Sequence, residues 1–310
     1  MAATDSAVRI DRRVLKALAQ PAPARLCLQV LFEWACVAAL IAVALHTTSI
    51  AAQALLMLLV ATRQHALLAL MHEFAHHQFS RRHPTLNDVL GDVFTAFPFF
   101  ITVHGFRRNH LAHHRHVATV DDPNWVAAMR KRRYRFPKRR RELWLEVARH
   151  VCGLRTLAEL KSYTVDARMS VELPPQVLAR QVFFFGAVIG LCAWLDAWRA
   201  LLFWLLPLST FLMAILYVRD IGEHYGMPAP GLERSRTVLC GWWERLLIGQ
   251  NSVGYHAEHH LFPSVPFFRL PRLHRHLRSD PAYAQQAVIV RGYAAGLFRQ
   301  VTQAPAGPAS

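Results

Sequence analysis

Four apolar stretches of membrane-spanning length are the feature of this sequence that most constrains its fold. They cover residues 26–45, 50–71, 177–195 and 200–218. A helix of about 20 mainly apolar residues is long enough to cross the hydrocarbon core of a bilayer. The first two stretches are joined by His46–Ser49 and the last two by a few residues around Asp196. We therefore expect an all-α integral membrane protein whose four transmembrane helices form two hairpins.

The distribution of basic residues predicts which side of the membrane each segment faces. The chain has 36 Lys and Arg against 20 Asp and Glu, and the basic residues gather in the N-terminal arm 1–25, between Arg107 and Arg149, and around 269–278. Lys and Arg are enriched in cytoplasmic segments of membrane proteins. We expect both termini on the cytoplasmic side, where 72–176 and 219–303 form a helical cap on a single domain, 26–303. The tail 304–310 is expected to be disordered.

A shorter apolar segment, Gly91–Ile101, is interrupted by Pro98. We interpret it as a re-entrant or interfacial helix, because a fifth span would place the C-terminal region on the opposite side of the membrane.

A strongly basic segment, Met129–Arg141, surrounds Tyr134 and Phe136 with Arg and Lys. Such a surface is attracted to anionic lipid headgroups. It would also suit the docking of an acidic electron-transfer partner, and the sequence leaves both interpretations open.

Other functional classes fit the sequence poorly. Nucleic-acid binding, a common role of basic chains, does not require several apolar stretches of bilayer length. The five cysteines are odd in number and form no CxxC pair, which argues against a disulfide framework or a thiolate metal site. The N-terminus has two acidic residues and no compact apolar core near Met1, so it does not resemble a cleavable signal peptide.

Histidines are concentrated in short motifs. Of 18 in the chain, ten fall in four places: HEFAHH at 72–77, HLAHH at 110–114, HAEHH at 256–260, and His224 just past the fourth apolar stretch. Residues three and four apart share one face of a helix. We therefore expect all three histidines of each HxxHH motif to point at one spot. In the first motif His72 and His76 share a face, whereas His77 is rotated away.

These motifs predict a metal site for two ions. Neutral imidazole is a ligand for Zn, Fe, Cu or Ni. A zinc site uses three or four protein ligands, so nine or ten histidines are too many for one ion. The candidate ligands are His72, His76, His77, His110, His113, His114, His224, His256, His259 and His260. Glu73 and Glu258 are expected to orient imidazoles instead of binding metal.

Isolated histidines are expected to lie on the surface or in a hydrogen-bonded core. They are His46, His65, His83, His150 and His274.

Taken together, HEFAHH, HLAHH, DDPNW at 121–125 and GYHAEHHLFPSVPFFRLPRLH at 254–274 make the chain resemble the membrane fatty acid desaturase/hydroxylase superfamily. The resemblance covers roughly Gln64 to His276. It implies four transmembrane helices under a cytoplasmic cap, with the histidines binding two iron ions.

The acyl-CoA desaturase branch of this superfamily suggests further assignments. There, a polar residue and a histidine four positions later join the metal site at the end of the fourth span, a spacing matched by Asp220 and His224. The family residue is typically Asn, so Asp220 is a candidate near the metal and not a firm ligand. In that branch the first-motif histidines are five apart, which favours His72 with His77, while helix geometry favours His76.

The resemblance implies an O₂-dependent oxidoreductase that desaturates an acyl chain of a lipid or acyl thioester. The LFP that follows the third motif favours desaturation. A hydroxylase or ketolase of the same superfamily, acting on a carotenoid, sphingolipid or alkane, is the alternative. Phe94, Phe97, Phe99 and Phe100 are candidates to line the substrate path, although such residues more often only pack.

Electrons must come from a separate protein, because the sequence has no haem-attachment motif, Cys₄ iron site or Gly-rich flavin fingerprint. We expect a ferredoxin-, rubredoxin- or cytochrome b5-like donor. A membrane metal transporter is a distant alternative. Transporters place polar ligands midway along their spans, whereas here the histidines are expected to cluster at one membrane face.

Overall fold

The computed structural model describes residues 8–161, 173–227 and 232–302, and within these ranges the chain is mostly helical. Four helical segments of this described chain are long and apolar enough to cross a membrane: α2 (Pro23–His46), α3 (Ile50–Ala75), α9 (Pro175–Trp194) and Trp198–His224, which consists of α10 (Trp198–Ser209) and α11 (Phe211–His224). The predicted fold class is therefore confirmed. The expectation of a disordered tail at 304–310 lies outside the described residues.

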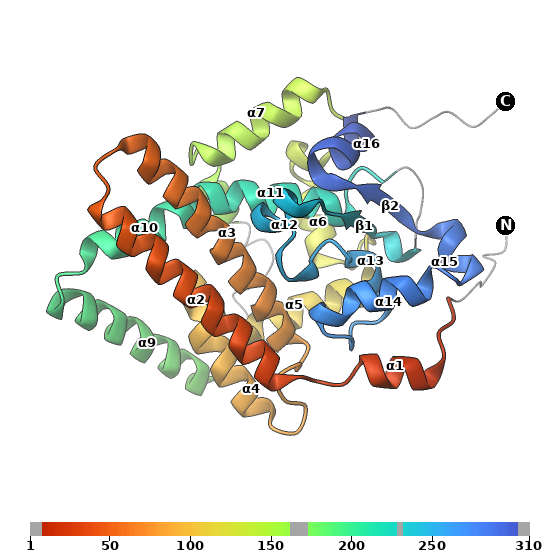
Figure 1. Cartoon of the computed structure of the whole chain (residues 1–310), viewed down its shortest axis with the longest axis horizontal. Helices are drawn as coiled ribbons and strands as arrows, with labels where there is room; N and C mark the ends of the chain where they lie inside the picture. Colours follow the sequence, from red (N-terminus) through yellow and green to blue (C-terminus); the bar gives the residue numbers. More distant parts are fainter. Residues whose placement is uncertain (1–7, 162–172, 228–231, 303–310) are drawn as a thin grey trace.

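Shorter elements make up the rest of the described chain. They are α1 (Arg12–Leu18), α4 (Pro84–Gly91), η1 (Asp92–Ala96), η2 (Phe97–Phe99), α5 (Val103–His116), α6 (Pro123–Met129), η3 (Arg132–Tyr134), α7 (Arg140–Val151), α8 (Thr156–Lys161), η5 (Leu232–Arg234), β1 (Arg236–Leu239), α12 (Trp242–Leu247), η6 (Gln250–Ser252), α13 (His256–Leu261), η7 (Phe267–Arg269), α14 (Leu270–Leu277), α15 (Pro281–Gln286), β2 (Val288–Arg291), η8 (Gly292–Leu297) and α16 (Phe298–Thr302). In Figure 1 the long helices α2, α9 and α10 gather on the left, and most of the shorter elements form a cap on the right that includes α1 and α16.

Burial changes along α3 and marks where the cap begins. From Ile50 to Leu59 the side chains are exposed or half-buried, whereas most of those from Val60 to Ala75 are buried. Exposed apolar side chains also surround α9 and α10, as expected for helices that face lipid. The second half of α3 is thus enclosed by protein, and it carries His72 into the cap.

The fourth apolar segment is broken in its middle. Pro207 has no N–H to donate and its ring crowds the carbonyl one turn earlier, which weakens a helix at that point. α10 ends at Ser209 and α11 begins at Phe211, with Thr210 between them in a non-helical conformation. α11 then continues into the cap and ends at His224.

The segment that contains Gly91–Ile101 leaves the end of α3 and returns to it. Its two halves, Pro84–Phe99 and Val103–His116, meet at 88°. At one end, Asn87 donates to the carbonyl oxygen of Phe74 (2.8 Å), and at the other His110 lies 3.0 Å from His76. Gly91 allows this close return, because a Cβ there would lie 2.7 Å from Cβ of Phe74. Such a bend is that of a broken span or of a re-entrant segment, and the re-entrant interpretation stays a prediction.

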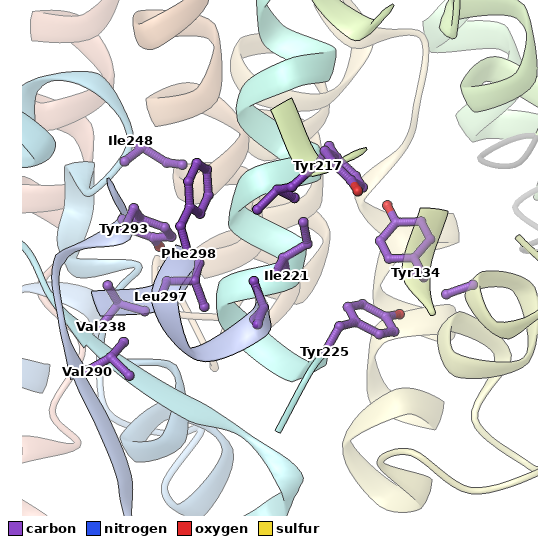
Figure 2. Close-up of a cluster of buried hydrophobic side chains, with 13 residues drawn as sticks. Tyr134, Tyr217, Ile221, Tyr225, Val238, Ile248, Val290, Tyr293, Leu297 and Phe298 are labelled. Atoms are coloured by element: carbon purple, nitrogen blue, oxygen red, sulfur yellow. The ribbon is translucent and has the colours of Figure 1, made fainter. Parts of the chain in front are cut away.

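A cluster of buried apolar residues holds α11 within the cap (Figure 2). Tyr217 and Ile221 on α11 belong to the same cluster as Val238 of β1 and Leu297 of η8. β1 and β2 pair in parallel. The fully buried Arg236 donates to the carbonyl oxygens of Ile221, Gly222, Tyr225 and Gly226. Because a cation is favourable at the C-terminal end of a helix, Arg236 stabilises α11 just where His224 lies.

Candidate metal centre

Nine of the ten candidate histidines converge in two groups within the described part of the chain. The first histidine group consists of His72, His76, His110, His114 and His259, and the second histidine group consists of His113, His224, His256 and His260. In each group, one ring nitrogen of every member lies within 4.8 Å of those of the others. The two groups adjoin, since the rings of His114 and His260 stack at 4.2 Å.

Four separate elements supply these side chains. α3 and its end provide His72 and His76, α5 provides the 110–114 motif, α11 ends at His224, and α13 provides the 256–260 motif. α5 starts where the hydroxyl of Thr102 accepts a hydrogen bond from the backbone N–H of Gly105, and this cap fixes the phase of the helix.

Each HxxHH motif is divided between the two groups. His110 and His114 belong to the first group and His113 to the second, while His256 and His260 belong to the second group and His259 to the first. The expectation that each motif points at one spot was therefore wrong. Successive residues of a helix are about 100° apart, so the adjacent histidines of an HH pair diverge. Pairs four apart stay together, and the third histidine reaches across to the neighbouring group.

The second histidine group has the protonation pattern that a cation requires. Nδ1 of His113 lies 2.9 Å from a carboxylate oxygen of Asp122, and Nδ1 of His224 lies 3.1 Å from the carbonyl oxygen of Arg234. The oxygens beside His113 and His224 only accept, so these two Nδ1 atoms carry the proton. Nδ1 of His256 lies 3.3 Å from the carboxylate of Glu223, within ion-pair range, which favours the same tautomer. In a neutral ring Nε2 then presents a lone pair.

Those lone pairs point at one another. Nε2 of His224 lies 3.1 Å from Nε2 of His113 and 2.8 Å from Nε2 of His256. Two nitrogens without protons cannot hydrogen-bond to each other, whereas a metal ion between them satisfies both. With metal–nitrogen bonds of about 2.0–2.1 Å, neighbouring ligand atoms are roughly 3 Å apart. The residues present therefore fit a bound metal ion.

The first histidine group has the same spacing. Nε2 of His110 lies 3.0 Å from that of His76 and 2.9 Å from that of His114, and Nε2 of His259 lies 3.0 Å from that of His114. Nε2 of His72 is buried and has no hydrogen-bond partner in the described chain. A second metal ion here would satisfy that orphaned nitrogen.

Burial favours the neutral form of most of these imidazoles. Burial, and then the neighbouring histidines, hold the pKa of His110, His256, His259 and His260 well below its ordinary value. For His76, burial and the nearby Arg107 lower the pKa to about 4. Metal ligation requires the unprotonated ring, so the protein presents these ligands ready to bind.

Two carboxylates that orient ligand imidazoles were not predicted from the sequence. Asp122, in the DDPNW motif, bonds His113, and Glu223 contacts His256 although it neighbours His224 in the chain. Their motif positions were visible, but the sequence does not show which ring each carboxylate meets. Only the fold reveals those pairs.

The predicted orienting residues have other contacts. Glu258 accepts hydrogen bonds from Tyr283 and from Thr237 and contacts Nδ1 of His274. Asp220 accepts from the hydroxyl of Tyr134 at 3.1 Å. Glu73 accepts from the backbone N–H of Phe267, and its other oxygen lies 3.8 Å from Nδ1 of His72. Of the three, only Glu73 is within ion-pair range of a histidine in either group.

His77 belongs to neither group among the residues that the structure describes. α3 ends at Ala75 with His76 as its C-cap, and His77 has a φ of +54°, in the left-handed region. This turn directs the chain away before His77 can join His72. The geometry thus brings His76 to the centre, while the roles of individual ligands stay predictions.

The isolated histidines lie on the surface or in a hydrogen-bonded core, as expected. His46 and His83 are exposed. His65, His150 and His274 are buried with hydrogen-bond partners on the ring, such as the carbonyl oxygen of Glu146 for His150.

Comparison with known proteins agrees with the geometry. The profile of the family described as "Fatty acid desaturase" matches residues 48–292. The dihydrorhizobitoxine desaturase of Bradyrhizobium elkanii is 29% identical over 247 residues, which cover 75% of this chain and 70% of the relative. The β-carotene ketolase of a Paracoccus species is 26% identical over 164 residues, covering 52% of this chain and 54% of the relative. The chain belongs to the fatty acid desaturase family and is a membrane oxidoreductase of that family with a histidine di-metal cluster.

Proposed function

We propose that this protein is an O₂-dependent di-iron enzyme that introduces a double bond into an acyl chain of a lipid or acyl thioester. The observation that carries the proposal is the convergence of two adjoining histidine groups where α3 and α11 end in the cap. When bound, two ferrous ions would supply the reduction of O₂ and the removal of hydrogen from an unactivated methylene. In desaturation, two electrons and two protons from the substrate and two of each from outside convert O₂ to two waters.

Iron is supported by the donor set and the family together. Imidazole ligands suit iron, zinc, copper and nickel. Zinc performs no redox chemistry, so it does not suit an oxidoreductase. Metal analysis of the purified protein tests this assignment: about two irons per chain are expected, and a protein that is active with zinc alone would contradict it.

The protein's own residues hold and shield the centre. Asp122 fixes the ring of His113 with Nδ1 protonated, and Glu223 lies within ion-pair range of Nδ1 of His256. His110, His256 and His259 are each more than nine-tenths buried, which limits the access of water. The apolar re-entrant segment lies beside the ligand helices, with Phe97 buried and Phe99 packed on Trp204 at 5.3 Å. These contacts support a packing role, and a substrate path along these phenylalanines stays a prediction.

Desaturation is favoured over oxygen insertion by the relatives. The relative named a desaturase aligns with 75% of the chain and the one named a ketolase with 52%. Lipid profiling of a host that expresses the gene, beside a host that expresses a His114→Ala variant, should reveal an added double bond. A product that carries ¹⁸O from ¹⁸O₂ would support a hydroxylase or ketolase instead.

An external electron donor has a suitable place to dock. A cavity of about 360 Å³ opens beside His114 and is also lined by Arg115, His116 and Arg234. Arg115 and His116 are exposed. The lining also includes Asp121 and Glu233, so the opening is of mixed charge. Its place beside His114 and the exposed Arg115 support an acidic ferredoxin-, rubredoxin- or cytochrome b5-like donor that delivers electrons close to a metal ligand.

The donor proposal is tested by charge reversal. Arg115→Glu should raise the KM for the donor protein and leave its turnover at saturation unchanged, whereas Arg275→Glu on α14 should have no effect. Multiple turnovers of purified protein with O₂ and no donor would contradict the proposal.

We also propose that both termini face the cytoplasm. In support, α1 and α16 lie in the cap, on the same side of the long helices (Figure 1). Reporter fusions at each terminus test this proposal, and a reporter active only on the outer side of the membrane would reverse it. The transporter alternative has little support, because the histidines gather where the long helices end and not midway along a path between them.

A further inference from the structure

A second cavity, of about 350 Å³, lies away from the metal centre. It is defined here as the basic cavity and is lined by Arg132, Arg133, Lys138, Glu142, Leu145, Glu146, Arg149 and Arg155. Four of these residues, at 142, 145, 146 and 149, repeat at three- and four-residue spacing and therefore share one face of α7. η3 and the link that follows it provide the opposite wall. Five cations against two carboxylates give the basic cavity a positive potential.

Part of this positive charge has no partner. Glu146 already accepts hydrogen bonds from Arg149 and Arg155, which leaves less negative charge for the other cations. Lys138 donates to the carbonyl oxygen of Arg132 at 2.8 Å and forms no direct ion pair with a described carboxylate, although Glu142 and Glu146 act on its charge across the cavity. A buried cation without a direct ion pair is costly.

Arg133 adds a second signal. Like Lys138, it is only 9% exposed, and it lines the basic cavity. One of its terminal nitrogens lies 2.6 Å from Glu159, but Nε is buried and has no hydrogen-bond partner in the described chain. Two buried cations beside an open cavity indicate a site for an anion.

Apolar side chains next to the basic cavity indicate what carries that anion. Leu145 lines it and is exposed, and Leu154 and Leu157 beyond the end of α7 are 74% and 83% exposed. The hydroxyl of Thr156 donates to the carbonyl oxygen of Ser209, at the break in the fourth apolar segment. This bond brings the segment that carries Leu154 and Leu157 next to the end of α10, whose exposed Leu206 belongs to a span expected to face lipid.

We propose that the basic cavity binds the phosphate headgroup of an anionic membrane lipid, whose acyl chains lie on Leu154 and Leu157. The pairing of a cationic pocket with an adjoining apolar surface is what an anionic lipid satisfies, since its charge and its chains are both matched. A water-soluble acidic protein fits less well, because docking there would press its polar surface against the exposed leucines. The bound lipid fixes α7, which packs on α11.

The full-length protein in nanodiscs tests the proposal. Its melting temperature is measured in phosphatidylcholine and in phosphatidylcholine mixed with phosphatidylglycerol, and native mass spectrometry counts the phosphatidylglycerol that remains bound in detergent. Wild type should melt higher with phosphatidylglycerol. Lys138→Gln should lose most of that increase and bind phosphatidylglycerol about fivefold more weakly, the equivalent of about 1 kcal/mol per cation at an anionic surface.

The matched control is Arg275→Gln, which removes one exposed positive charge from α14, remote from α7 (Figure 1). It should keep the full increase. Equal losses in the two variants would overturn the proposal in favour of diffuse attraction. The proposal would also fail if inorganic phosphate abolished the effect of phosphatidylglycerol. It would fail too if the only effect of Lys138→Gln were to raise the KM for an acidic donor protein. Should Lys138→Gln fold poorly, Arg132→Gln serves as the second variant, with the same expected loss.

Discussion

At the scale of single residues, we predict opposite effects of substituting the adjacent histidines His76 and His77. His76 faces His110 in the first histidine group, while His77 turns away with a positive φ. Asparagine tolerates the left-handed region, so it replaces either residue without adding strain. We expect His76→Asn to lose metal. Its activity should fall by more than the roughly 10–100-fold that is typical of losing an outer-sphere partner. His77→Asn should keep both. Metal content and turnover of the two purified variants decide between them, and the reverse order would favour His77 as the ligand.

The carboxylate behind His113 makes a second residue-scale prediction. Asp122 accepts from Nδ1 of His113 and from the backbone N–H groups of Ala118 and Asn124. An amide at this position turns one acceptor into a donor, so the ring of His113 is held less firmly. We expect Asp122→Asn to bind metal about 10–100-fold more weakly in competition with a chelator. The neighbouring Asp121→Asn, on an exposed side chain, is the control, and equal affinity in both variants would remove Asp122 from the site.

The histidines could be predicted from the sequence, but their carboxylate partners could not. Spacing within one helix is local information, so His110 and His114 were recognisable as a pair. Asp122 returns to His113 through a turn, and Glu223 reaches His256 from a different helix. Such pairs depend on how elements are arranged in space. The division of each HxxHH motif between two groups agrees with helix geometry, but it could be recognised only once both groups were known.

At the scale of elements, the ion pair between Asp88 of α4 and Arg107 of α5 predicts a pH dependence. Arg107 makes two hydrogen bonds to Asp88, and it also donates to the carbonyl oxygens of Ala75 and Phe74 at the end of α3. Burial alone would raise the pKa of Asp88, but its bonds to Arg107 and to Asn87 lower it below its ordinary value. The pair thus holds three helices together beside the first histidine group.

A carboxyl group whose pKa is lower in the folded state stabilises the fold above its unfolded pKa, which is about 3.9 for Asp. That contribution is lost as the pH falls through the lower, folded value. Asp88→Asn should therefore reduce the stability at pH 7 by about 1–2 kcal/mol. The difference in melting temperature from wild type should shrink as the pH falls below about 4. A difference that stays constant with pH would show that packing, and not charge, is responsible.

The long helices were predictable because hydropathy is a property of consecutive residues. The predicted second span, 50–71, ended where polar residues begin, but α3 continues to Ala75 because the cap encloses its last turns. The predicted fourth span, 200–218, likewise ends before α11 does, since α11 extends to His224. In both cases tertiary packing sustains a helix beyond the apolar stretch. The 88° bend of the re-entrant segment also needed the fold, since Pro98 marks an interruption but not its angle.

At the scale of the whole molecule, α3, α5, α11 and α13 all contribute histidines to the two groups of the metal centre. The convergence of these distant segments could be predicted from the sequence, because metal binding explains so many histidines at the ends of membrane helices better than any other role. The sequence did not predict the basic cavity as a pocket between two elements. Its walls come from η3 and from one face of α7, and the position of α7 is set by its packing on α11.

Metal binding should therefore stabilise the cap as a unit. With the ions removed, the lone pairs of His113, His224 and His256 face one another unsatisfied, and four elements lose their common attachment. A ligand that binds only the folded state adds about 2.7 kcal/mol when its free concentration is a hundredfold above its Kd. We expect a chelator to lower the melting temperature of wild type and of His77→Asn, and adding ferrous iron back to restore it. The same treatment should barely affect a His76→Asn/His256→Asn double variant, which lacks a ligand in each group. If wild type melts at the same temperature with and without metal, the histidines do not join these helices through bound ions.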